Sequence, residues 1–174
     1  MRSKPSLSLT LPVVAMLLLL LCVSAVQSAP PEQQAARILE TCGVQGGLIV
    51  HVGCGDGKVT AALRAGDAYI VHALDRDGAD VTEARRYVTS RGLYGPVSVD
   101  HWTGDALPYV DNLANLVVVE SKADVPMSEL MRVLAPHGVA CIVEGDTLRT
   151  TTKPWPEEMD EWTHYLHGPD GNPV

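Results

Sequence analysis

Short apolar runs alternate along this chain with stretches in which apolar positions recur every three or four residues. Five runs have the length and residue types of buried strands: 48–52, 68–74, 96–99, 116–119 and 139–143. Four stretches have the period of amphipathic helices: 31–42, 58–65, 79–91 and 126–134. Because runs and periodic stretches alternate, we expect an α/β fold, a Rossmann-like doubly wound sheet that is mostly parallel.

The N-terminal segment does not follow this pattern. Arg2 and Lys4 precede an apolar segment over 11–26, and small residues follow it. This order is typical of a signal peptide, so we expect residues 1–29 to be removed and the protein to be exported to the periplasm or cell surface. A membrane anchor is the alternative, but the apolar run is shorter than the ~20 residues that span a bilayer.

Composition limits the rest of the chain to one domain. At 174 residues and 46% hydrophobic content, the chain can bury a single core, which we place over 30–148. Residues 149–174 contain Pro154-Trp155-Pro156 and Gly168-Pro169-Asp170-Gly171, which indicate a linker or tail. Residues 1–29 hold two of the 13 basic residues and none of the 21 acidic ones, so the remainder has a net charge of −10. We expect no nucleic-acid partner, and membrane contact only through an uncleaved N-terminal segment.

Cysteine and histidine spacing does not indicate a metal site. Beyond the N-terminal segment the cysteines are Cys42, Cys54 and Cys141, an odd number with no zinc-site spacing. We interpret them as small, buried side chains. His164 and His167 share a helical face but have no third ligand nearby.

The candidate chemistry begins where the first predicted strand ends. Gly53, Gly55 and Gly57 follow that strand and precede a helix, an arrangement that lets backbone amides approach a nucleotide closely. The dinucleotide fingerprint fails because Lys58 occupies its third glycine position, and the P-loop pattern fails because Val52 replaces its first glycine. Asp75 ends the second predicted strand, where its carboxylate can accept hydrogen bonds from ribose hydroxyls.

This region resembles the class I S-adenosylmethionine-dependent methyltransferases, in particular the type 11-like group. Residues 48–57, LIVHVGCGDG, are similar to the signature "VLDLGCGTG" of that family. Residues 101–109 resemble its "GDA..LPF" segment, and residues 127–138 resemble its "EL.RVLKPGG" helix and turn. The three matches lie in the family's order and cover about residues 35–145. The resemblance implies a Rossmann-like fold, S-adenosylmethionine as a small-molecule cofactor, and methyl transfer to an acceptor that the sequence does not identify.

The resemblance also implies which residues contact the cofactor. The candidates are His51, Gly53, Cys54, Gly55, Gly57, Asp75, Arg76, Asp105, Ala106 and Glu120. In the family, an aspartate at the position of Asp105 recognises the adenine amino group. Glu120, at the end of the fourth predicted strand, is also a weak candidate for a base that acts on or orients the acceptor; a solvated strand end is the alternative.

Three positions depart from the family pattern. His51 replaces an acidic residue that helps to hold the ammonium group of the cofactor's methionine end, and an imidazole does not replace a carboxylate in that contact. Asn115 replaces an aspartate, which removes a charge but keeps a hydrogen-bonding side chain. His137 replaces a turn glycine, a modest change because histidine tolerates the left-handed conformation better than most residues.

The C-terminal part leaves two functions open. We expect the methyltransferase core to end after the fifth strand, without the helix and antiparallel strand pair that follow it in the family. Residues 153–174 are similar to a junction that precedes a pyrroloquinoline-quinone-binding-like β-propeller in large exported bacterial proteins. The chain is therefore interpreted either as a methyltransferase, which the intact glycines, Asp75 and Asp105 favour, or as an inactive module of the same fold that serves as a scaffold.

Overall fold

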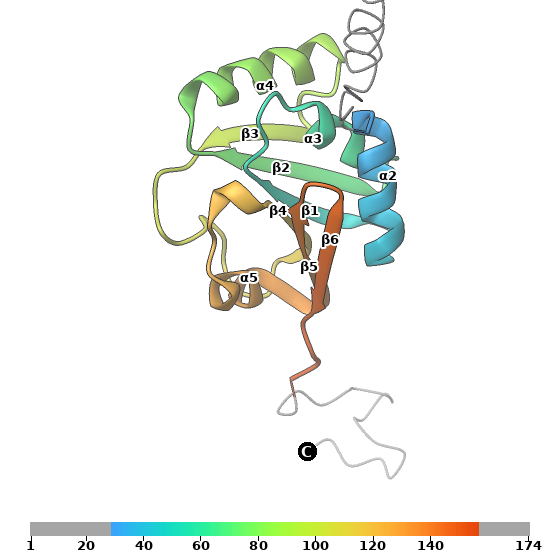
Figure 1. The fold of residues 1–174 in the computed structure, drawn as a ribbon, viewed down its shortest axis with the longest axis vertical. Coiled ribbons are helices and arrows are strands. Elements are labelled where there is room, and N and C mark those ends of the chain that lie inside the picture. The colour runs from blue at the N-terminus through green and yellow to red at the C-terminus, as the bar shows by residue number, and fades with distance from the viewer. Residues whose placement is uncertain (1–28, 157–174) are drawn as a thin grey trace, which may run out of the picture.

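A six-stranded sheet forms the centre of the protein, in the order β3-β2-β1-β4-β5-β6 (Figure 1). The computed structural model describes residues 29–156. Strands β1 to β5 are parallel, and β6 is antiparallel to β5. The strands are β1 (Gly47–Val52), β2 (Tyr69–Asp75), β3 (Val97–His101), β4 (Ala114–Glu120), β5 (Leu134–Glu144) and β6 (Thr147–Thr152).

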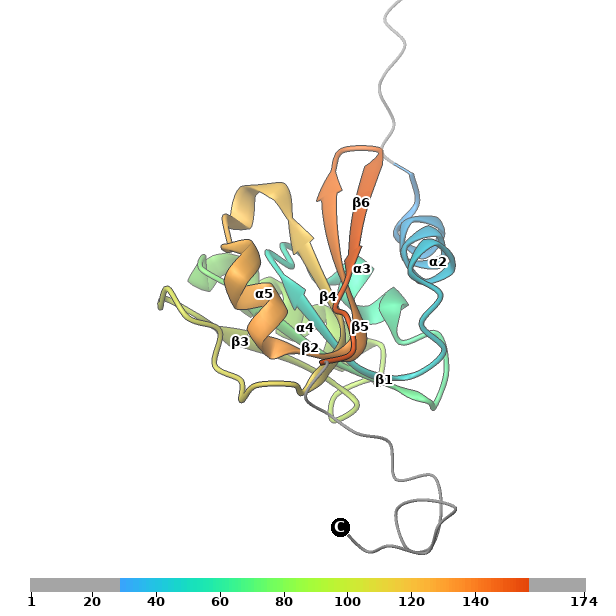
Figure 2. The same ribbon diagram turned by 90° about the horizontal axis from the view of Figure 1, so that it is seen from below.

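Helices cover both faces of the sheet (Figure 2). One face carries α2 (Pro31–Cys42), α3 (Lys58–Leu63) and α4 (Gly78–Ser90), whose apolar side chains pack on those of the strands. The other face carries α5 (Met127–Val133), and the short 3-10 helix η1 (Ser121–Ala123) follows β4. The result is the predicted Rossmann-like α/β sheet, because parallel strands must be covered on both faces.

The prediction that the core ends after the fifth strand is wrong, because a sixth strand, β6, follows it in the sheet. Strand β6 pairs with β5 from Val139 opposite Thr152 to Glu144 opposite Thr147. The turn between them contains Gly145, whose φ is 58°. Threonine favours strands, but every side chain of β6 apart from Leu148 is exposed. The sequence of this edge strand therefore lacks the apolar alternation from which a strand is predicted. Strand β6 also continues past residue 148, where we placed the end of the domain.

Two of the unusual positions behave as expected. The Asn115 side chain accepts a hydrogen bond from the backbone N–H of Leu48 at 3.0 Å, so its amide replaces the carboxylate as an acceptor. His137 has a φ of 62°, in the left-handed region where the family has glycine. Its imidazole stacks on the ring of Trp155, with 5.5 Å between the ring centroids. Neither substitution disturbs the fold.

Several predictions concern residues outside the described range. The predicted signal peptide lies there except for Ala29, and so do His164 and His167. Within 29–156, no helix is both long and apolar enough to cross a membrane. Cys54 and Cys141 are buried and Cys42 is half-buried, and none of the three forms a disulfide.

Candidate functional site

The glycine loop connects β1 to α3 at the carboxyl edge of the sheet, and it needs its glycines. The φ angles of Gly53, Gly55 and Gly57 are 83°, 53° and 76°, all in the left-handed region. A Cβ on Gly57 would lie 2.7 Å from the Cβ of Ala84, so the loop is in close contact with α4. A Cβ on Gly53 would lie 3.1 Å from the Cβ of Glu120. The loop is therefore held tightly between α4 and the end of β4.

Asp75 fixes this loop through its carboxylate. The side chain is 6% exposed and accepts hydrogen bonds from the backbone N–H groups of Gly55, at 2.9 Å, and Asp77, at 3.0 Å. These two bonds use different carboxylate oxygens, and each oxygen has a second lone pair. Asp75 can therefore hold the loop and still accept hydrogen bonds from a ligand.

A cavity of about 250 Å³ opens beside Asp75; we call it the Asp75 cavity. Its lining residues are Val52, Gly53, Asp75, Arg76, Asp77, Asp80, Trp102, Lys122 and Ala123. Trp102 is 5% exposed and donates from its indole N–H to the carbonyl of Ala106 at 2.8 Å. The Arg76 guanidinium lies 4.4 Å from the centroid of the Trp102 ring. The cavity thus combines an apolar wall with a carboxylate acceptor, which suits a nucleoside.

The structure brings together only some of the predicted site residues. Gly53, Asp75 and Arg76 line the Asp75 cavity, whereas Asp105 is exposed and is not among its lining residues. Ala106 contributes its carbonyl to Trp102. Cys54 is buried, and burial, together with the charge of Asp75, raises the pKa of its thiol to about 12. Cys54 is therefore neutral at physiological pH and serves as packing.

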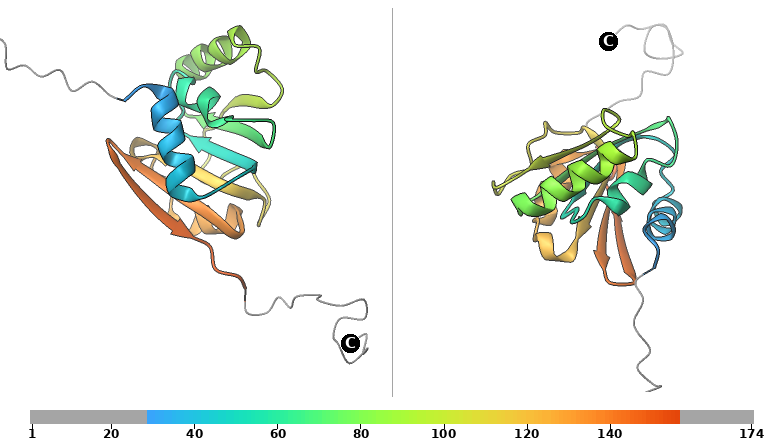
Figure 3. Two further views of the ribbon diagram at one scale, coloured as in Figure 1. Left: turned by 90° about the vertical axis from the view of Figure 1, so that its right-hand side faces the viewer. Right: turned by 90° about the horizontal axis from the view of Figure 1, so that it is seen from above.

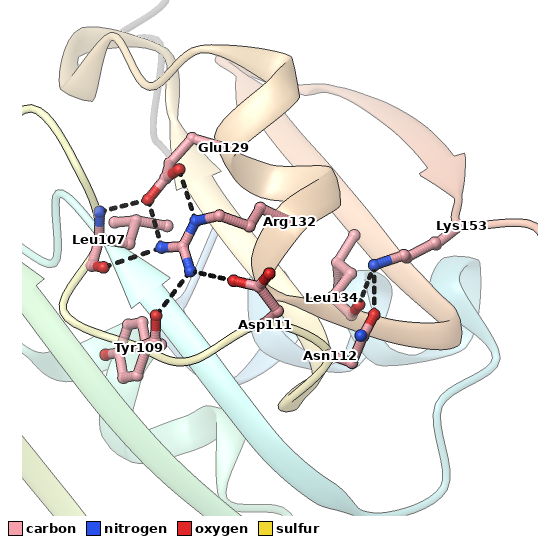
Figure 4. Close-up of polar contacts among 8 residues, drawn as sticks. All are labelled: Leu107, Tyr109, Asp111, Asn112, Glu129, Arg132, Leu134 and Lys153. Atoms are coloured by element: carbon pink, nitrogen blue, oxygen red, sulfur yellow. Dashed lines mark hydrogen bonds and ion pairs between the residues drawn. The ribbon is translucent and has the colours of Figure 1, made fainter. Parts of the chain in front are cut away.

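A pair of charged residues on α5, which sequence reasoning left without a role, holds the loop between β3 and β4 (Figure 4). Arg132 donates to the carbonyls of Leu107, at 3.1 Å, and Tyr109, at 2.8 Å, and to the carboxylate of Asp111, at 2.7 Å. Glu129 accepts from the N–H of Leu107 at 2.6 Å and pairs with Arg132. The hydrogen bond from Arg132 holds the pKa of Glu129 below its ordinary value.

This Glu129–Arg132 clamp holds the β3–β4 connection at Leu107, Tyr109 and Asp111. Lys153 adds a second anchor, donating to the side chain of Asn112 at 2.6 Å and to the carbonyl of Leu134 at 2.8 Å (Figure 4). The available sequence signal was the i, i+3 spacing of Glu129 and Arg132 on one helix. That spacing indicates a pair within the helix, but it does not reveal the backbone that the pair binds.

His51 and Glu120 lie next to each other on strands β1 and β4. His51 is 1% exposed; its Nδ1 lies 2.8 Å from the Thr60 hydroxyl, and its Nε2 lies 3.7 Å from a Glu120 carboxylate oxygen. Glu120 lines a second cavity, of about 280 Å³, which we call the Glu120 cavity. Its other lining residues are Ala29, Gln34, Arg37, Val143, Gly145, Asp146 and Leu148. His51 lines neither cavity.

Metal binding has no support among the described residues. No group of three or more histidine, cysteine, aspartate or glutamate side chains within 29–156 is arranged to hold a metal ion.

The chain matches known proteins in the region that builds this site. Residues 49–138 match a family model described as a methyltransferase domain. Ribosomal protein L11 methyltransferase from an Exiguobacterium species is 38% identical over 81 residues, which are 47% of this chain and 25% of that protein. The chain therefore covers about a quarter of the length of this curated relative.

Solved structures share the fold. One, from Methanococcus maripaludis and assigned as an S-adenosyl-L-methionine-dependent methyltransferase, superposes with a TM-score of 0.60 at 21% identity, over 82% of this chain and 66% of that one. Geranyl diphosphate methyltransferase in complex with S-adenosylmethionine has a TM-score of 0.56 at 19% identity, over 64% of this chain and 48% of that one.

S-adenosylmethionine is the cofactor that these matches indicate, and the described residues fit it. At Gly53 a side chain would meet Glu120 and Ala123, so only glycine keeps the edge of the Asp75 cavity open. Asp75 keeps free acceptor capacity for ribose hydroxyls, and Trp102 gives an apolar wall for a base. The chain belongs to the class I S-adenosylmethionine-dependent methyltransferase family.

Proposed function

We propose that this domain binds S-adenosylmethionine in the Asp75 cavity and transfers its methyl group to an acceptor. The observation that carries the proposal is the placement of Asp75, a buried carboxylate with free acceptor capacity, beside a loop of left-handed glycines. Asp75 accepts from the ribose hydroxyls, and Trp102 and Val52 contact the adenine ring. Asp105 stays a predicted contact for the adenine amino group.

The reaction makes modest demands on the protein. The cofactor supplies an activated methyl group on a sulfonium, and transfer is an in-line displacement whose rate depends mainly on proximity and orientation. The glycine loop, which Asp75 holds through the N–H of Gly55, supplies orientation at the edge of the Asp75 cavity. Glu120 stays a predicted contact for the cofactor and a predicted base that acts on or orients the methyl acceptor.

We further propose that the domain acts outside the cytoplasm, next to a β-propeller module. Support comes from the signal-peptide-like order of residues 1–29 and from the similarity of residues 153–174 to the junction before such propellers. The scaffold interpretation makes the opposite prediction for cofactor binding, so one binding experiment separates the two functions.

Calorimetric titration of the purified full chain with S-adenosylmethionine tests the proposed function. We expect the parent to bind, and Asp75→Asn to bind at least roughly tenfold more weakly because it loses a charged acceptor. Asp67→Asn is the control, because Asp67 is 99% exposed and outside both cavities. A folded parent that does not bind would overturn the proposed function and favour the scaffold interpretation.

A further inference from the structure

Two cysteines that are far apart in the sequence meet where α2 packs on β5. Cys42 is the last residue of α2, and Cys141 lies within β5. Cys141 is fully buried in the core on this face of the sheet, and the half-buried Cys42 packs against the same core. Figure 3 shows α2 beside the β5–β6 hairpin. The fold therefore brings two thiols together across a contact between a helix and the sheet.

The two thiols interact with each other. A hydrogen bond between their side chains raises the pKa of Cys42, to which burial also contributes, and lowers the pKa of Cys141. Opposite shifts of this kind are typical of two neighbouring groups that share a proton. The third cysteine of the described range, Cys54, lies in the glycine loop beside Asp75. Cys42 and Cys141 are therefore the pair whose sulfurs are placed to bond.

Only one member of this pair can be reached from solvent. Cys42 lines a cavity of about 260 Å³ near the starts of β1 and β4, together with His137 and Val139. Val139 precedes Cys141 by two residues on β5, so both side chains point to the same face of the sheet. A small oxidant can approach Cys42 through this cavity, whereas Cys141 lies behind it in the core.

We propose that Cys42 and Cys141 form a disulfide in an oxidising compartment, and that this bond fastens α2 to the sheet. The bond closes a loop of roughly 100 residues, and closure of a long loop stabilises most in the chain-entropy account of disulfides. Disulfides persist in exported proteins, so the bond suits the export that we propose for this chain. The inference does not depend on methyl transfer.

The bond forms by exchange with a small disulfide oxidant such as oxidised glutathione. Cys42 gives up its proton and attacks one sulfur of the oxidant, whose S–S bond breaks as one glutathione thiolate leaves. Cys141 then gives up its proton, attacks Sγ of Cys42 and displaces the second glutathione. The two protein thiols lose two electrons, which reduce the oxidant, and the two protons end on the glutathione thiols.

The test is peptide mapping and thermal unfolding of the full chain after equilibration with oxidised glutathione. Digestion with trypsin and chymotrypsin cuts between Cys42 and Cys54 at Leu48, so linked peptides identify the bonded cysteines. We expect Cys42 to be linked to Cys141, and Tm to be at least about 5 °C higher before reduction with dithiothreitol than after it.

Variants separate this pair from the other cysteines. Cys42→Ala and Cys141→Ala should each abolish the change in Tm on reduction, whereas the control Cys54→Ala should keep it. Each protein is compared with its own reduced form, so a variant that is itself destabilised still gives a valid comparison. A glutathione adduct on Cys42 without the link to Cys141, or a bond from Cys42 to Cys54, overturns the proposal. A linked pair whose reduction leaves Tm unchanged overturns the role in fastening α2.

Discussion

At the scale of single residues, the glycines of the loop share a backbone conformation but differ in the space around them. Gly55 and Gly57 both have positive φ, so alanine at either position is strained by roughly 1–2 kcal/mol. A Cβ on Gly55 would meet nothing within 4 Å, whereas one on Gly57 would lie 2.7 Å from the Cβ of Ala84. The two positions therefore separate backbone strain from steric contact.

We predict that Gly57→Ala destabilises the protein more than Gly55→Ala does. Both variants have the strain, and Gly57→Ala adds an overpacking cost of about 1–3 kcal/mol against α4. Urea unfolding of the parent and the two variants measures the difference in the free energy of unfolding. Equal losses would mean that the loop moves away from α4 at little cost.

Cys54 shows why a residue inside a family signature need not be reactive. It lies between two of the loop glycines, yet its side chain is buried and the pKa of its thiol is raised. The sequence interpretation of Cys54 as packing is confirmed by this burial.

At the scale of elements, the Glu129–Arg132 clamp joins α5 to the β3–β4 connection. That connection contains no helix, so its backbone groups need partners from elsewhere, and Arg132 and Glu129 supply them. Hydrogen bonds to charged groups contribute about 1.5–3 kcal/mol each when they are buried, and less when they are exposed.

We predict that Arg132→Met lowers the free energy of unfolding at pH 7, because it removes the hydrogen bonds to the carbonyls of Leu107 and Tyr109. Arg149→Met is the control; Arg149 is 70% exposed and pairs with Glu144, so its loss should cost less than about 0.5 kcal/mol. Urea unfolding measures both variants, and equal costs would contradict a structural role for the clamp.

The same clamp predicts a pH dependence. Arg132 lowers the pKa of Glu129 below its ordinary value of 4.5, so the folded state favours the ionised carboxylate. This contribution is fully present above pH 4.5 and is lost as the pH falls through the folded-state pKa. The stability gap between the parent and Arg132→Met should therefore narrow below pH 4.5. A gap that stays constant from pH 7 to pH 3.5 would contradict this.

At the scale of the whole molecule, the two cavities lie at the carboxyl edge of the sheet: Gly53, which follows β1, lines the Asp75 cavity and is close to Glu120, which lines the other. The Asp75 cavity collects residues from the ends of β1, β2 and β3, and the Glu120 cavity adds α2 and the β5–β6 turn. This is the edge where open α/β sheets bind ligands. The turn before the antiparallel β6 lines the Glu120 cavity, and its Asp146 carbonyl accepts a hydrogen bond from Arg37.

We predict that the exported form of the protein begins near residue 30. The basic start, the apolar segment and the small residues that follow predict cleavage rather than a lasting membrane anchor. Intact-mass analysis of the chain recovered from a secreting host measures the N-terminus. Recovery of the full-length chain in the membrane fraction would favour the anchor alternative.

The sequence by itself determined the order of strands and helices, the glycine loop, the acid at the end of β2 and the cofactor family. These features are local: the apolar period follows from secondary structure, and left-handed backbone favours glycine. The helix over 31–42 was predicted with the bounds that the structure gives it. The left-handed conformation of His137 followed from the same local reasoning.

Only the tertiary structure decided which distant residues share a space. It added β6, whose polar side chains carry no apolar period at the edge of a sheet. It placed Arg37 and Glu120 in one cavity, His51 behind Glu120, and Arg132 on the backbone of the β3–β4 connection. It also left Asp105 outside the Asp75 cavity. Such contacts depend on how whole elements pack against each other, and sequence spacing does not encode that.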